Sequence, residues 1–181
     1  TEIPTGLAFP AIYRRVDVRD CLVARGGMKF ADLPNRARLG TSSLRRQAQL
    51  RHIRPDLTVL ELRGNVDTRL RKLDEGQYDA IVLAKAGLDR LGWSEKITDV
   101  FSAESVLPAV GQGALGIECR EKDANVMELL AKLDHAETRA CVTAERALLA
   151  KLEGGCQVPL GAWGRIEAGR LLLDAIVLAA D

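Results

Sequence analysis

Strand-like and helix-like patterns alternate along the middle of the chain, and this alternation restricts the possible folds more than any other feature. Short apolar runs predict strands at 20–24, 38–41, 58–62 and 78–84, and helical spacing predicts helices at 43–53, 66–73 and 87–91. Strands that alternate with helices are typical of βαβ units in a mainly parallel sheet. We therefore expect one α/β unit between Val16 and Ala109.

The remainder of the chain predicts a second group of elements. The expected strands lie at 114–119 and 171–179, and the expected helices at 126–133 and 136–152. Gly154 and Gly155 follow the longer helix, where glycine commonly ends one. Because so few strands cannot close a core alone, we expect the polypeptide to continue beyond Asp181. Thr1 stands where a first methionine is expected, so we also expect a missing N-terminal part.

Composition excludes several classes of function. The net charge is +1 and aromatic residues are only 4% of the chain, so no nucleic-acid partner is expected. The apolar stretches are too short to cross a bilayer, so no membrane partner is expected either. The four cysteines form no C-x-x-C pair, which argues against a metal site and favours reduced thiols in the cytosol. They are Cys21, Cys119, Cys141 and Cys156.

The first segment with chemical character joins the strand at 38–41 to the following helix. It carries the hydroxyl residues Thr41, Ser42 and Ser43, followed closely by Arg45 and Arg46. Free backbone N–H groups at a helix start favour an anion, and arginine adds bidentate donors suited to carboxylate or phosphate. The alternative is an ordinary serine N-cap with solvated arginines.

The next strand–helix junction repeats this arrangement with Arg63, Gly64, the expected N-cap Asn65, and Arg69. Strand ends and helix starts meet at one edge of a parallel sheet, so the arginines of both junctions are expected to converge. Between residues 36 and 72 there are ten Lys or Arg and three acids. This local charge predicts a site for a ligand with several carboxylates; the alternative is separate surface arginines in helix ion pairs.

Two further motifs contain glycine. Cys156 follows two glycines, which leaves its thiol approachable for covalent attachment or nucleophilic attack, although most free cysteines are small buried hydrophobes. The stretch at 107–114 lacks a phosphate-loop pattern and predicts a hinge or a crossover between two lobes. His52 and His135 lie in polar surroundings and are expected at the surface.

Five segments in order and spacing resemble the porphobilinogen deaminase family: GTSSLRR, LRGNVDTRL, YDAIVLAKAGLDRLG, LPAVGQGALGIECR and LEGGCQVPLGA. The resemblance implies a three-domain α/β architecture. Its first two domains are similar to the lobes of type II periplasmic binding proteins, and its third is a small α/β domain. On this basis 16–109 is the complete second domain, 1–15 and 110–133 belong to the first, and 136–181 begin the third.

The resemblance also implies a dipyrromethane cofactor, attached covalently through Cys156. The family's carboxylate-binding and catalytic positions correspond here to Arg45, Arg46, Arg63 and Arg69. Thr41, Ser42, Ser43 and Gly64 are expected to contact the cofactor beside them.

The implied reaction joins four porphobilinogen units into hydroxymethylbilane and releases ammonia, in a monomeric enzyme of the cytoplasm or a plastid. The family's catalytic aspartate belongs to a Lys-Asp-Val-Pro motif expected just before Thr1, so we expect little activity from these 181 residues alone. A non-enzymatic carboxylate-binding module similar to periplasmic binding proteins is the alternative function. A third reading is a fragment without a ligand.

Overall fold

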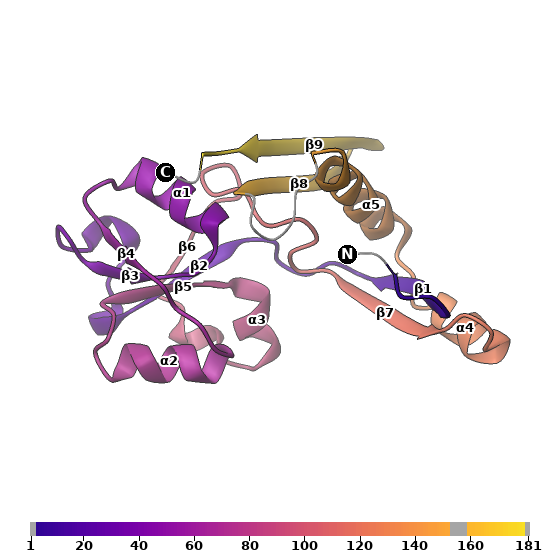
Figure 1. Ribbon diagram of the computed structural model, residues 1–181, viewed down its shortest axis with the longest axis horizontal. Coiled ribbons are helices and arrows are strands. Elements are labelled where there is room, and N and C mark those ends of the chain that lie inside the picture. The colour runs from indigo at the N-terminus through magenta and orange to yellow at the C-terminus, as the bar shows by residue number, and fades with distance from the viewer. Residues whose placement is uncertain (1–2, 153–158, 180–181) are drawn as a thin grey trace.

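The computed structural model describes residues 3–152 and 159–179, and within them the strands form three separate sheets (Figure 1). The largest sheet has five strands, in the order β4-β3-β5-β2-β6. Its strands are β2 (Asp20–Ala24), β3 (Arg38–Gly40), β4 (Thr58–Leu60), β5 (Ala80–Ala84) and β6 (Asp99–Val100). Its α-helices are α1 (Leu44–Ile53), α2 (Val66–Asp74) and α3 (Lys85–Arg90), with short 3-10 turns at Arg25–Gly27, Phe30–Asp32 and Ser94–Lys96. The predicted α/β class is confirmed.

The sheet is mixed, so the prediction of a mainly parallel sheet is wrong for half of its pairings. β3 runs parallel to β4 and β5, because α1 and α2 return the chain to the starting edge before each next strand. β2 runs antiparallel to both β5 and β6. The segment from β2 to β3 contains only 3-10 turns, and β2 pairs with β5 rather than with β3. No crossover helix therefore makes β2 run parallel to its neighbours in the sheet.

Apolar side chains cover both faces of this sheet because successive residues of a buried strand point to opposite sides. On one face, Leu22 and Val82 pack in a cluster with Leu50 of α1. On the other, Val23 and Ile81 pack in a second cluster, which includes residues of α2 and α3. Figure 1 shows the resulting three layers, with α1 on one side of the sheet and α2 and α3 on the other.

Side-chain caps start the two helices that follow the predicted strand–helix junctions. Ser43 is the N-cap of α1 and accepts a hydrogen bond from the backbone N–H of Arg46. Asn65 is the N-cap of α2, as predicted, and accepts from the N–H of Thr68 at 2.9 Å. A cap of this kind satisfies one of the unpaired N–H groups at a helix start. The sequence therefore defines both junctions locally.

The other two sheets have two strands each. β1 (Leu7–Tyr13), which was not predicted, pairs antiparallel with β7 (Leu115–Arg120), and α4 (Ala124–Ala131) packs beside them. β8 (Leu160–Glu167) and β9 (Arg170–Val177) form an antiparallel hairpin against α5 (Ala136–Lys151). In the described ranges, no helix is long and apolar enough to cross a membrane.

Two connections join the five-stranded sheet to the β1–β7 sheet. Residues 14–19, here called the first connection, lead from β1 to β2, and residues 101–114, the second connection, lead from β6 to β7. They touch where the N–H of Val16 donates to the carbonyl of Gly113 at 3.3 Å. The stretch at 107–114 is thus a crossover between sheets, as its glycine content indicated.

Candidate functional site

The two predicted strand–helix junctions lie side by side. The N–H of Thr41 donates to the carbonyl of Leu60 at 2.9 Å, which extends the parallel pairing of β3 and β4 by one residue. The hydroxyl of Ser42 then donates to the carbonyl of Leu62 and accepts from its N–H, both at 2.9 Å. One serine side chain therefore fixes the start of the second junction against the first.

Glycine at position 40 allows this close approach. A Cβ there would lie 2.8 Å from Tyr78 and 3.0 Å from Ile81, closer than side chains normally pack. The hydroxyl of Tyr78 donates to the carbonyl of Glu61 at 2.6 Å and so fixes the backbone at the start of the second junction. The two junctions are held together by a backbone hydrogen bond, the hydroxyl of Ser42 and the buried Tyr78.

Arg45 and Arg46 are buried, and both form ion pairs with Asp20. One oxygen of Asp20 accepts from Arg45 Nη1 at 2.8 Å, and the other accepts from Arg46 Nη2 at 2.7 Å. Asp20 is fully buried at the first position of β2. Because β2 is antiparallel to β5, its first residue lies at the edge where β5 ends. Arg45 and Arg46, which were expected to line a ligand-binding site, thus form an internal cluster of two guanidiniums and one carboxylate.

Electrostatics in this cluster favour the ionised form of Asp20. Burial raises the pKa of Asp20, but the charges of Arg46 and Arg45 outweigh burial and hold the pKa below its ordinary value. Burial lowers the pKa of Arg45. Two positive charges face one negative charge, so the cluster keeps an excess of one positive charge. Within the described residues, Arg45 Nε is a buried donor without a hydrogen-bond partner.

Arg69 and Arg63 lie at the same edge but differ in exposure. Burial lowers the pKa of Arg69, and the charge of Arg46 lowers it further. Arg69 Nε donates to the carbonyl of Gly64 at 2.7 Å. The side chain of Arg63 is 80% exposed and forms an ion pair with the exposed Glu61. Arg63 is thus the member most available to a ligand.

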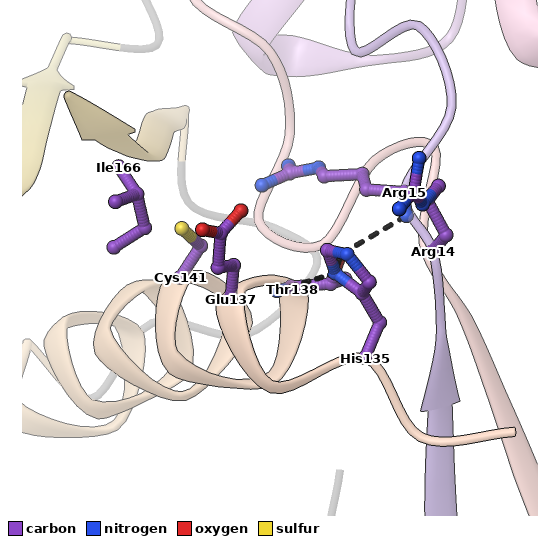
Figure 2. A pocket seen from close by; sticks show the side chains of 7 residues that line it. All are labelled: Arg14, Arg15, His135, Glu137, Thr138, Cys141 and Ile166. Carbon is purple, nitrogen blue, oxygen red and sulfur yellow. Dashed lines mark hydrogen bonds between the residues drawn. The ribbon is translucent and has the colours of Figure 1, made fainter. Parts of the chain in front are cut away.

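Cys156 lies outside the described residues, so its surroundings are not part of this geometry. His52 is exposed and His135 is half-buried. His135 is the N-cap of α5, and its Nδ1 accepts a hydrogen bond from the backbone N–H of Thr138 at 3.2 Å. A separate cavity of about 330 Å³ opens beside that cap, and Figure 2 shows Arg14 and Arg15 above the start of α5 there. It lies between β1 and the third sheet, away from the arginines of α1.

The described cysteines differ in how accessible their thiols are. Cys21 is fully buried next to Asp20, and burial raises its pKa to about 12. Burial also raises the pKa of Cys141. Cys119 on β7 is only half-buried, with its sulfur 3.4 Å from that of Met127.

We expect iodoacetamide at pH 8 to alkylate Cys119 well before Cys21 in the folded protein. At pH 8 only about one Cys21 thiol in ten thousand is ionised, given a pKa of about 12, and the thiolate is the reactive form. Peptide mass spectrometry over a time course measures both rates. Urea should abolish the difference, and equal rates in the native protein would contradict the burial of Cys21.

Sequence comparisons agree with the motifs. Residues 1–128 match the family model described as "Porphobilinogen deaminase, dipyromethane cofactor binding domain". Residues 139–181 match "Porphobilinogen deaminase, C-terminal domain". The chain is 56% identical over its whole length to a porphobilinogen deaminase of Roseiflexus castenholzii and 57% identical to one of Desulforudis audaxviator. It spans 60% and 59% of the length of those relatives.

Comparison of folds finds looser similarity to solved structures. A periplasmic binding protein of Salmonella typhimurium, described as specific for arginine, aligns with 77% of this chain and 61% of its own, with a TM-score of 0.42 and 16% identity. A lipoprotein of the YaeC family from Enterococcus faecalis gives a TM-score of 0.44 over 78% of this chain and 68% of its own, with 15% identity. Similarity this low carries no argument about the site. The family models and the two deaminase relatives, in contrast, show that this chain belongs to the porphobilinogen deaminase family.

Proposed function

We propose that the protein containing this chain joins four porphobilinogen units into hydroxymethylbilane and releases ammonia. The observation that carries the proposal is the adjacency of the two strand–helix junctions, which gathers four arginines at one sheet edge in a chain of this family. In this proposal 16–109 form a complete second domain, 1–15 with 110–133 belong to the first, and 136–181 begin the third. The protein acts as a monomer in the cytoplasm.

The residues at this edge fit a cofactor that carries several carboxylates. The cluster of Arg45, Arg46 and Asp20 retains one excess positive charge, and Arg45 Nε is a buried donor left without a partner in the described part of the chain. Arg63 adds donors on the solvent side. Charge-assisted hydrogen bonds are the strong ones in such a site. We propose that these groups hold a dipyrromethane attached to Cys156.

The bound dipyrromethane supplies the pyrrole carbon to which porphobilinogen is joined. The residues of this chain contribute binding and orientation. Arg63 and Arg69 bind acetate and propionate groups, and the N–H groups at the starts of α1 and α2 favour the same negative charge. Thr41, Ser42 and Ser43 shape the loop beside them, and Gly64 leaves the backbone of the second junction open. Holding the reacting units in place lowers the entropic part of the barrier.

The test is ammonia release and porphobilinogen consumption by the full-length protein and its Arg63→Met variant. Loss of one charge-assisted hydrogen bond costs about 1.5–3 kcal/mol, so kcat/KM should fall about tenfold or more. Arg71→Met is the matched control, because Arg71 is also exposed and also pairs with a glutamate, but near the other end of α2. The kcat/KM of Arg71→Met should stay within twofold of that of the unaltered protein. Equal effects of the two changes, or no ammonia release at all, would contradict the proposed function.

A further inference from the structure

The buried cluster of Arg45, Arg46 and Asp20 has a fourth member, Gln112, which comes from the second connection. Gln112 Nε2 donates to Asp20 Oδ1 at 2.9 Å, and Gln112 Oε1 accepts from Arg45 Nη2 at 3.4 Å. The same Nε2 donates to the carbonyl of Val18 in the first connection at 2.6 Å. One amide therefore touches the carboxylate, one guanidinium and both connections.

Further hydrogen bonds tie the arginines to their surroundings. Arg45 Nη1 donates to the carbonyl of Leu107 in the second connection at 2.5 Å, and Arg46 Nη1 donates to the carbonyl of Val82 in β5 at 3.2 Å. The side chain of Gln49 brackets Leu107, because it donates to the carbonyl at 3.1 Å and accepts from the N–H at 2.7 Å. The second connection is thus held on α1 at two points.

The geometry of Asp20 explains why two like charges can lie together without solvent. Each guanidinium takes a different carboxylate oxygen, and the oxygen shared with Arg46 Nε and Nη2 also accepts from Gln112. A buried charge is tolerated when it is paired and fully hydrogen-bonded. Asp20, which is fully buried, is thus the one side chain that orients both guanidiniums by ion pairs in the described part of the chain.

We propose that Asp20 is a positioning residue that sets the two guanidiniums at the start of α1 for carboxylate binding, and that Gln112 couples their position to the two connections between the sheets. The inference rests on the proposed function, because the carboxylates in question are those of porphobilinogen and the cofactor. Val18 and Gln112 lie in the two connections between the sheets, so in this proposal a change in the angle between the sheets shifts them relative to β2. The amide transmits that movement to Arg45 and Asp20.

The test uses the full-length, cofactor-loaded protein and the change Gln112→Met, which keeps the side-chain volume and removes both hydrogen-bonding ends. We expect KM for porphobilinogen to rise at least fivefold. Asp20→Asn should raise KM further, and adding Gln112→Met to it should have little additional effect on KM, because the amide and the carboxylate belong to one hydrogen-bonded unit. Such non-additivity is the sign of a shared unit. Additive effects of the two changes would overturn the coupling.

Asp79→Asn separates positioning from stability. Asp79 pairs with Arg38 on the same sheet, away from the cluster, so this change should lower the unfolding temperature and leave KM unchanged. If Asp20→Asn does not fold, the KM of Gln112→Met alone still tests the coupling. A folded Gln112→Met protein with KM within twofold of the unaltered protein would overturn the inference. Absence of turnover in the unaltered protein would instead contradict the proposed function.

Discussion

Replacing Glu145 by glutamine is expected to lower the free energy of unfolding of the full-length protein by about 3–5 kcal/mol, the cost of leaving one member of a buried ion pair alone. Glu145 is fully buried on α5 and takes both terminal nitrogens of Arg15, at 2.5 and 3.2 Å. It also accepts from the N–H of Gly111 at 2.6 Å and of Gly164 at 2.7 Å. This carboxylate therefore joins both connections to α5 and β8. Urea unfolding measures the loss.

Glutamine cannot replace these contacts, because its NH2 end would face donors. Glu137 provides the matched control: it lies on the same helix but is exposed, and Glu137→Gln should change the free energy of unfolding by less than about 0.5 kcal/mol. Similar unfolding curves for the two variants would show that Glu145 does not hold the sheets together.

Gly113→Ala is expected to cause the second largest loss in the free energy of unfolding. Gly113 has φ of +84°, and a Cβ there would lie 2.8 Å from the carbonyl oxygen of Asp17 and 2.9 Å from that of Val16. The left-handed conformation costs alanine about 1–2 kcal/mol. Contact with backbone atoms adds about 1–3 kcal/mol, since they cannot rotate away as a flexible side chain does. Together the expected loss is about 2–5 kcal/mol in the same urea measurement.

Gly26→Ala isolates the conformational part of that cost. Gly26 has φ of +68° and nothing within 4 Å of its Cβ position, so only the strain of about 1–2 kcal/mol is expected. The difference between the two variants measures how tightly the two connections cross. Equal losses would mean that the first connection moves freely away from Gly113.

Much of the fold could be predicted because its signals are local. Residues 21–24 are a continuous apolar run, and Ser43 and Asn65 are capping residues directly before helical patterns. The adjacency of the two junctions followed from the parallel pairing of β3 and β4, which the helix between them requires. The strand β1 was missed, since its partner β7 is more than one hundred residues away.

Asp20 was missed for a reason of topology. In a parallel sheet the first residue of β2 would lie at the edge opposite to Arg45, and only the antiparallel pairing of β2 with β5 brings them together. Glu145 was missed because a single glutamate in a helical pattern is usually solvated. An aspartate that opens an apolar strand was the available signal: an acid there is buried and needs a partner.

We propose that the protein containing this chain carries out its family's chemistry through a cofactor attached at Cys156. Intact-protein mass spectrometry of the full-length protein, beside its Cys156→Ser variant, tests it most directly. We predict that the unaltered protein has the mass of its sequence plus one dipyrromethane, and that the serine variant has the mass of its sequence alone. An unmodified mass in actively turning-over protein, or an added mass that persists in the variant, would contradict the account.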